Sequence, residues 1–85
     1  MPMCYNGKVR DFEVSFEVVA GRWMLNRIEY EVRKYARSLG LKVDVYEARG
    51  LIRGRAMYVL KGRGTDEFSQ SVKDDVDAWQ RKVAA

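Results

Sequence analysis

Histidine is absent from this 85-residue sequence, which contains only one cysteine and one proline. Histidine is the commonest general base and the commonest metal ligand in proteins. Its absence argues against most hydrolase mechanisms and against zinc sites. The single cysteine, Cys4, has no second cysteine to pair with, so neither a disulfide scaffold nor a dithiol redox protein is expected.

Long apolar runs are also missing. Charged residues interrupt every apolar segment well before the ~18 residues that a membrane span requires. The segment Met1–Lys8 lacks the apolar core of a secretory signal. We therefore expect a soluble, cytoplasmic protein with no membrane partner, no cofactor, no metal and no evident small-molecule substrate.

The residues that are present indicate a folded chain. Hydrophobic residues make up 47% of the sequence, and its formal charge is +4. This composition differs from that of disordered chains, and the length suits one small domain over residues 1–85. A domain of this size is marginally stable, which favours partners or self-association.

The first half of the chain has one strand pattern followed by one helix pattern. Apolar and polar residues alternate over Arg10–Ala20, which predicts a half-buried strand with an acidic outer face. Before it, Asn6-Gly7 is a turn signal, so residues 1–7 are expected to be either flexible or a short extra edge strand through Met3–Tyr5. From Arg22 to Leu39 the apolar residues recur every three or four positions, which predicts an amphipathic helix that Gly40 ends.

The second half predicts a hairpin and another helix. One alternating run begins at Leu41 and a second covers Ile52–Lys61, with a turn around Ala48-Arg49-Gly50 between them. Gly54 is expected to mark either a bulge or a close backbone approach to the helices. Gly62-Arg63-Gly64 is expected to break the strand, and Thr65 to cap a helix. The apolar face of this helix would contain Phe68, Val72, Val76, Trp79 and Val83.

The order strand, helix, strand, strand, helix predicts an α+β fold. A right-handed crossover followed by a hairpin gives a three-stranded antiparallel sheet in the order 1-3-2, with both helices on one face. This arrangement resembles a ferredoxin-like fold that lacks its last strand. The resemblance concerns topology and implies no activity. It leaves the outer edge of the first strand open unless Met3–Tyr5 covers it, and an open edge favours edge-to-edge dimers.

Three sets of residues are candidates for catalytic or ligand sites, but each is better explained by another role. The carboxylates of the first strand face Lys42, Arg53 and Arg55 on the same sheet face, which predicts ion pairs rather than a catalytic dyad. The three helical aspartates Asp74, Asp75 and Asp77 point in different directions and predict a solvated surface. Gly62-Arg63-Gly64-Thr65 lacks the spacing of a phosphate-binding loop, and Asp66 would repel an anion there. We therefore expect no enzymatic activity.

One short segment resembles an RNA-binding family. Arg53-Gly54-Arg55-Ala56 is similar to the start of the RNA-recognition-motif signature, which also lies on a third strand. The resemblance covers four residues and then stops. The outward positions where that family stacks bases hold Arg55 and Met57 here, so base stacking on this sheet is not expected.

The most informative feature is the side of the first helix that faces away from the predicted core. Five positions at steps of four and three form a stripe opposite the apolar stripe. The stripe, called the ridge below, consists of Trp23, Arg27, Tyr30, Lys34 and Arg37. It interleaves two aromatic residues with three cations over roughly 21 Å of helix.

Three explanations of the ridge are open. The helix could begin later, so that Trp23 turns back against the sheet edge and Tyr30 is simply an exposed aromatic packed under an arginine. The ridge could bind a protein, either a foreign partner or a second copy, because Trp, Tyr and Arg dominate binding hot spots. It could bind nucleic acid, with cations on phosphates and aromatic rings on bases.

The charge distribution bears on the nucleic-acid alternative. Residues 1–64 carry a net charge of +6 and residues 65–85 carry −2. The second basic cluster, on the predicted hairpin, consists of Arg49, Arg53, Arg55, Lys61 and Arg63. Acids such as Glu29 and Glu47 interrupt this positive field. The sequence therefore favours a non-enzymatic module that binds a protein or self-associates, with nucleic-acid binding as the alternative.

Overall fold

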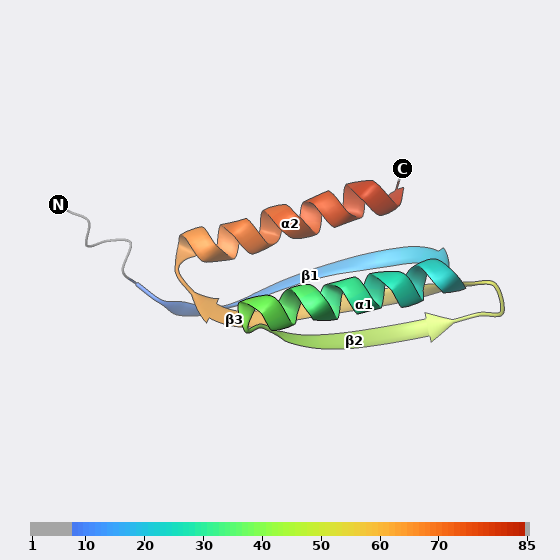
Figure 1. The fold of residues 1–85 in the computed structure, drawn as a ribbon, viewed down its shortest axis with the longest axis horizontal. Coiled ribbons are helices and arrows are strands. Elements are labelled where there is room, and N and C mark those ends of the chain that lie inside the picture. Colours follow the sequence, from blue (N-terminus) through green and yellow to red (C-terminus); the bar gives the residue numbers. More distant parts are fainter. Residues whose placement is uncertain (1–7, 85) are drawn as a thin grey trace.

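The computed structural model describes residues 8–84 and shows five elements in the predicted order. They are β1 (Arg10–Gly21), α1 (Arg22–Leu39), β2 (Lys42–Arg49), β3 (Arg53–Gly64) and α2 (Asp66–Ala84). The strands form one antiparallel sheet in the order β1-β3-β2 (Figure 1). The predicted α+β fold and strand order are confirmed, and the likeness to a ferredoxin-like fold extends no further than this topology. The expected strand Met3–Tyr5 lies outside the described residues.

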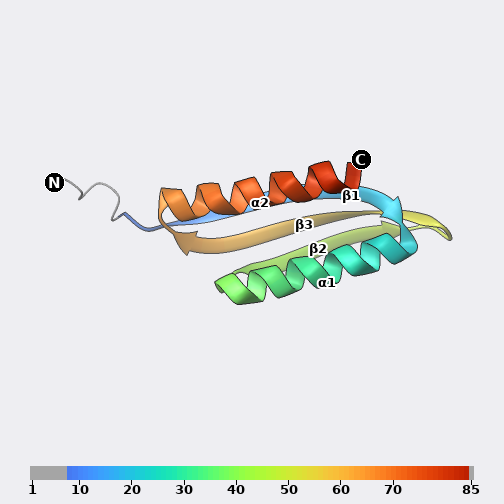
Figure 2. The same cartoon turned by 45° about the horizontal axis from the view of Figure 1, so that its top comes forward.

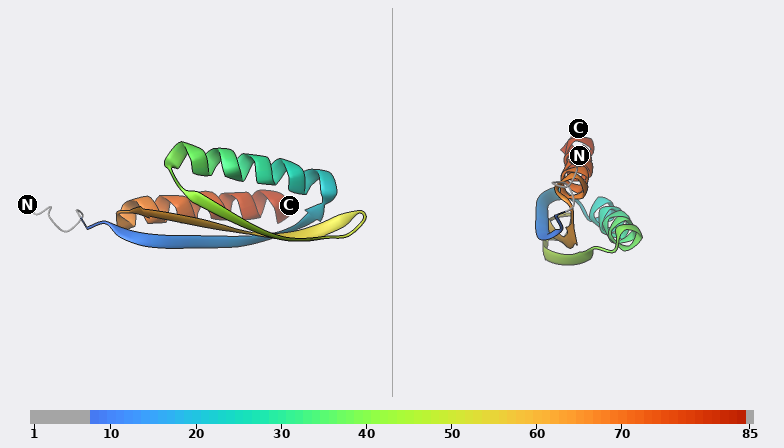
Figure 3. Two further views of the ribbon diagram at one scale, coloured as in Figure 1. Left: turned by 90° about the horizontal axis from the view of Figure 1, so that it is seen from below. Right: turned by 90° about the vertical axis from the view of Figure 1, so that its left-hand side faces the viewer.

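Both helices cover the same face of a strongly twisted sheet (Figures 2 and 3). Burial alternates along β1, with every second residue from Val14 to Ala20 buried and the residues between them exposed. This alternation is the predicted one, and it places the core between the sheet and the helices. Within residues 8–84, β1 pairs with β3 alone, so its other edge carries no strand there.

The strand pairing is continuous. β1 pairs with β3 from Arg10↔Gly64 to Gly21↔Arg53. The register has no bulge, so the close approach is the correct one of the two expectations for Gly54. A Cβ atom there would lie 3.0 Å from Leu25 Cδ1 of α1.

The predicted turn of the hairpin was placed too early. Arg49 is the last residue of β2, and the turn contains Gly50, Leu51 and Ile52. The amide of Gly50 donates a hydrogen bond to the carbonyl of Arg53 at 2.7 Å, which closes the turn. Ile52 was expected inside the strand, but it is 78% exposed at the turn.

The predicted strand break at Gly62-Arg63-Gly64 is wrong, because β3 continues to Gly64. Gly62 lies opposite Phe12 in the register. A Cβ atom at Gly62 would collide with Leu41 Cδ2 and lie 3.1 Å from Phe12 Cζ. These glycines therefore leave room for neighbouring apolar side chains instead of ending the strand.

Aromatic side chains connect the layers of the core. Phe16 of β1 stacks on Tyr58 of β3 with ring centroids 5.2 Å apart, and on Trp79 of α2 at 5.9 Å. Trp79 also contacts Tyr35 of α1 edge-to-face at 5.0 Å. The surrounding cluster of buried aliphatic residues includes Val14, Val18, Leu25, Ile28, Val32, Leu60, Val72 and Val76. The side chain of Val83, expected on the same face of α2, lies outside the described part.

The helix ends follow the predicted signals. Gly40 has a φ of 73° at the C-terminus of α1, and the amide of Leu41 donates to the carbonyl of Ala36 at 2.8 Å. Glycine is favoured there because other residues rarely adopt a left-handed backbone. At α2, the hydroxyl of Thr65 accepts a hydrogen bond from the amide of Phe68 at 3.2 Å. Both predicted ends are confirmed.

Replacing Gly62 with alanine tests the packing at the end of β3. We expect Gly62→Ala to lower the free energy of unfolding by about 1–3 kcal/mol, because the new methyl group overpacks Leu41 and Phe12. Gly21→Ala is the control, since a Cβ atom there has only the carbonyl of Ile52 within 4 Å, at 3.9 Å. Urea denaturation measures both variants, and equal stability of the two would contradict the packing argument.

Replacing Tyr58 with phenylalanine tests a polar group in the core. The Tyr58 hydroxyl is buried without a hydrogen-bond partner in the described structure. Burial, with the nearby carboxylates of Glu29 and Glu47, raises its pKa to about 12. Because an unpaired buried hydroxyl opposes folding, we expect Tyr58→Phe to leave the free energy of unfolding at pH 7 unchanged or raise it by about 1 kcal/mol.

The same variant has an alkaline signature. Above pH 10 the unfolded tyrosine loses its proton while folded Tyr58 keeps it until about pH 12. The native state then binds more protons than the unfolded state, so stability falls as pH rises through this window. Urea denaturation from pH 9 to 11 should show a smaller fall for Tyr58→Phe than for the wild type. An equal fall in both proteins would contradict this assignment.

Candidate functional site

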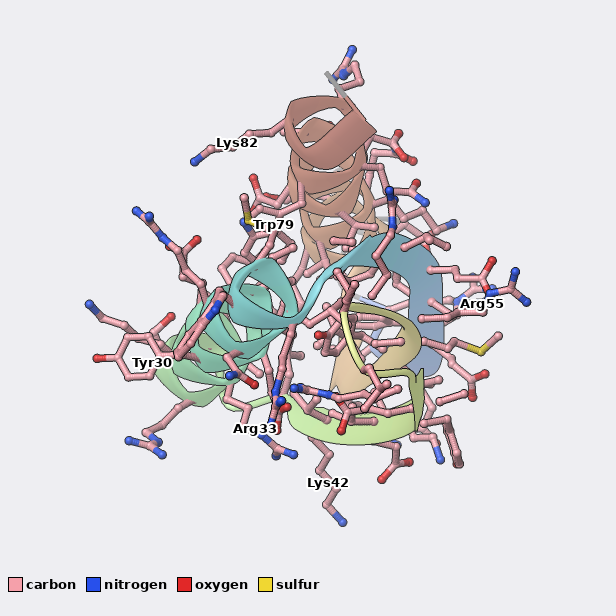
Figure 4. The ribbon with its side chains drawn as sticks, turned by 90° about the vertical axis from the view of Figure 1, so that its right-hand side faces the viewer. Tyr30, Arg33, Lys42, Arg55, Trp79 and Lys82 are labelled. Atoms are coloured by element: carbon pink, nitrogen blue, oxygen red, sulfur yellow. The ribbon has the colours of Figure 1, made fainter. Side chains whose placement is uncertain are left out.

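Helix α1 has one face in the core and the ridge on the opposite face. The core face contains Leu25, Ile28, Val32 and Ala36, all buried. On the ridge, Trp23 is 84% exposed and Tyr30 is 67% exposed. Arg27, Lys34 and Arg37 are exposed as well, and Figure 4 shows Tyr30 pointing away from the sheet.

The explanation that the helix begins later is wrong. Helix α1 starts at Arg22, directly after the extended backbone of Gly21. The amide of Arg22 donates a hydrogen bond to the carbonyl of Ile52 at 3.0 Å, which ties the first helical turn to the β2–β3 turn. Trp23 is therefore already part of the helix, and its side chain extends into solvent rather than onto the sheet.

The ridge cations differ in their ion pairing. Arg27 contacts Glu31 at 3.4 Å, one helical turn further on. Lys34 and Arg37 have no acidic partner within 4.0 Å among residues 8–84. Arg37 also lines a shallow hollow together with Arg33, Leu41 and Val43. The C-terminal half of the ridge therefore presents positive charge that the described protein does not neutralise.

The second basic cluster is largely engaged in ion pairs. Arg49 contacts Glu47 at 2.7 Å and Glu29 at 3.8 Å, and it donates a hydrogen bond to Asn26 at 2.7 Å. Because Asn26 and Glu29 belong to α1, Arg49 joins the hairpin to the helix. This role is structural, and the sequence did not indicate it.

The outer face of the sheet carries the predicted ion-pair lattice, with partly different members. Its pairs are Arg55–Glu17 at 3.5 Å, Lys61–Asp44 at 3.0 Å and Arg63–Asp11 at 3.3 Å. The hydrogen bond from Lys61 to Asp44 raises the pKa of that lysine. Of the expected cationic members, Arg55 takes part, whereas Lys42 and Arg53 have no acidic partner within 4.0 Å in the described chain. Arg53 is thus the one cation of the second cluster with no ion pair among these residues.

The members of the second basic cluster on the outer sheet face do not form one surface with the ridge. In the end-on view of Figure 4, Tyr30 and Arg55 point to opposite sides of the molecule. Tyr30 projects from α1, which covers one face of the sheet, and Arg55 projects from the other face. A single flat or linear partner cannot contact both clusters in full.

A third group of polar residues lies between the helices. The Tyr35 hydroxyl donates a hydrogen bond to Asp75 at 2.5 Å, beside Trp79 and Lys82. Burial and the Asp75 carboxylate raise the pKa of Tyr35 well above its usual value. The hydroxyl therefore keeps its proton further into the alkaline range than a free tyrosine does, and its hydrogen bond links α1 to α2. Within residues 8–84, no three acidic or cysteine side chains gather to hold a metal ion.

Comparison with known proteins gives no relative. Neither protein-family models, nor curated proteins, nor solved structures match this chain. Neither described helix has the length and apolar character needed to cross a bilayer.

Replacing Arg49 with alanine tests whether this residue is structural. Its contacts with Asn26, Glu29 and Glu47 are lost in Arg49→Ala, so we expect the free energy of unfolding to fall by about 1–2 kcal/mol. Arg53→Ala removes the same charge without removing an ion pair and should change stability by less than about 0.5 kcal/mol. Urea denaturation followed by circular dichroism compares them, and equal effects would show that Arg49 does not join hairpin and helix.

Proposed function

We propose that this protein is a non-enzymatic interaction module that binds a partner protein through the ridge on α1. The observation that carries the proposal is the exposure of Trp23 and Tyr30 on the far face of a helix whose other face is buried. Large aromatic residues and arginines supply much of the binding energy at protein interfaces. A rigid helix holds them in place without a further ordering cost.

The chemistry of the ridge favours a partner with an acidic surface. Lys34 and Arg37 are exposed and without an ion pair within residues 8–84. A second copy of the ridge would bring like charges together, which disfavours self-association through this face. An acidic partner would neutralise the cations while its apolar groups cover the two aromatic rings. The single cysteine of the sequence fits a reducing, cytoplasmic setting for this module.

Nucleic acid is the second candidate. Aromatic side chains alternating with cations are the groups that bind single-stranded nucleic acid, by stacking on bases and by pairing with phosphates. The ion pairs of Arg49, Arg55, Lys61 and Arg63 weigh against a contribution from the hairpin. Binding through the ridge alone would give a log–log salt slope of about −2 for single strands.

Site-specific photo-crosslinking at Tyr30 tests the proposal. A photoreactive phenylalanine analogue at position 30 should crosslink a protein in the native cells, and the same analogue at Tyr46 should not. Tyr46 is the matched control because it is 61% exposed on the outer sheet face. Mass spectrometry identifies the crosslinked species.

The second part of the test measures the affinity of the wild type and its variants for the partner that crosslinking identifies. Tyr30→Ala should weaken binding by at least about tenfold, as expected for an interface hot spot, and Tyr46→Ala should leave it unchanged. Lys34→Glu should weaken binding more strongly at low salt than at high salt, because salt screens the attraction between charges. Crosslinks to nucleic acid at position 30 would favour the second candidate. Crosslinks to the chain itself, with a dimer in light scattering, would favour self-association.

A further inference from the structure

Three segments meet at one end of the molecule, two that follow each other in the sequence and one that is distant from them. They are the end of β1, the first turn of α1 and the β2–β3 turn, which projects past the start of α1 (Figures 1 and 3). The hydrogen bond from the Arg22 amide to the Ile52 carbonyl, 3.0 Å long, joins two of them. The register pair Gly21↔Arg53 joins the third.

This end exposes large apolar side chains. Leu51 is 92% exposed and Ile52 is 78% exposed, and Trp23 stands one residue from the hydrogen bond that holds Ile52. We call Trp23, Leu51 and Ile52 the apolar tip. Leu51 and Ile52 are largely exposed on a projecting turn, so the fold does not stabilise them by burial. Large exposed apolar side chains brought to one end of a molecule in this way favour a site of interaction there.

The surroundings of the apolar tip are positively charged. Residues 18–24 and 48–56 contain four arginines and no acidic residue. Arg49 and Arg55 pair with acids further along the strands. Arg22 and Arg53 have no acidic partner within 4.0 Å among the described residues, and both are exposed. The apolar tip therefore lies beside cations that the described chain leaves free.

We propose that the apolar tip docks on the surface of an anionic lipid bilayer. Leu51 and Ile52 enter the boundary between headgroups and acyl chains, and Trp23 lies at the headgroup level, where tryptophan is enriched. Arg22 and Arg53 contact lipid phosphates, since long cationic side chains reach the headgroups while their stems stay in the interface.

Shape and charge favour a bilayer over other partners. The tip is a projecting turn beside a helix end, and a bilayer accepts a protruding group without a preformed pocket. A second copy of the tip would place arginine against arginine, whereas anionic headgroups attract both. Docking on the bilayer surface requires no membrane-spanning helix. It differs from the expectation, drawn from the sequence, that the protein has no membrane partner.

Vesicle flotation tests the proposal with the full chain. The probes are vesicles of phosphatidylcholine alone and vesicles with about 30% phosphatidylserine. We expect binding to the anionic vesicles at 100 mM salt, weaker binding at 500 mM salt, and none to the neutral vesicles. Tryptophan emission should shift to the blue on binding, and Trp23→Phe should abolish that shift. Failure of the wild-type chain to float with anionic vesicles would overturn the proposal.

Paired variants separate a specific contact from general attraction. The double substitution Leu51→Ser with Ile52→Ser should reduce the vesicle partition constant at least tenfold without loss of helical circular dichroism. Arg53→Glu should reduce it at least fivefold, because each basic residue near an anionic surface contributes about that factor. Lys34→Glu makes the same charge change on the ridge and should have a smaller effect. Equal losses for Arg53→Glu and Lys34→Glu, or no loss for the double variant, would refute docking through the tip.

Different variants test vesicle binding by the apolar tip and protein binding by the ridge. Tyr30→Ala should leave vesicle binding unchanged, and the Leu51 and Ile52 double variant should leave the crosslinks at position 30 unchanged. A protein crosslinked from a photoreactive group at Leu51, in a chain that does not float with anionic vesicles, would identify the tip as a protein site. That outcome would also overturn the lipid proposal.

Discussion

The stacking of Phe16 between Tyr58 and Trp79 is the contact on which the layered structure depends. It joins the edge strand β1, the central strand β3 and helix α2 in one place. Trp79 in turn contacts Tyr35 of α1, so this aromatic group fixes both helices relative to the sheet. An 85-residue chain has room for one apolar layer, and each of its large side chains therefore serves several elements.

Because α1 is held by a full apolar stripe, its opposite face is free and fixed in direction. Leu25 and Val32 are completely buried on the core side. A rotation of the helix that buried Trp23 would expose these residues, at a cost of roughly 1.5–3 kcal/mol for each. The packing of the core thus keeps the aromatic residues of the ridge at the surface. This fixed exposure supports the proposal that they bind a partner.

The two proposed surfaces meet at Trp23 but differ in chemistry. The ridge alternates aromatic and cationic side chains along a helix, whereas the apolar tip combines aliphatic side chains with arginines at a turn. Most other basic residues of the hairpin form ion pairs within the molecule, as the contacts of Arg49 illustrate. Because of these ion pairs, fewer basic side chains are available to a partner than the composition suggests.

Much of the fold could be predicted because its signals are local. The alternation in β1, the helical spacing in α1, the glycine after Leu39 and the threonine before α2 are each read within a few residues. The ridge could be predicted for the same reason, since one helical period fixes which residues lie opposite the core. The errors at Gly62 and at the hairpin turn had a different origin. Gly62 serves the packing of Leu41 and Phe12, which are far away in sequence. At the hairpin, the hydrogen bond from the Gly50 amide to the Arg53 carbonyl sets the position of the turn.

The sequence by itself therefore determined the element order, the buried face of each element and the composition of the ridge. Only the tertiary structure decided which cations are free, because ion pairs such as Arg63–Asp11 join residues that strand register brings together. It also decided that Trp23, Leu51 and Ile52 share one end of the molecule. Periodicity describes neighbours along the chain, whereas register and packing set distances between segments, and the properties of these surfaces depend on those distances.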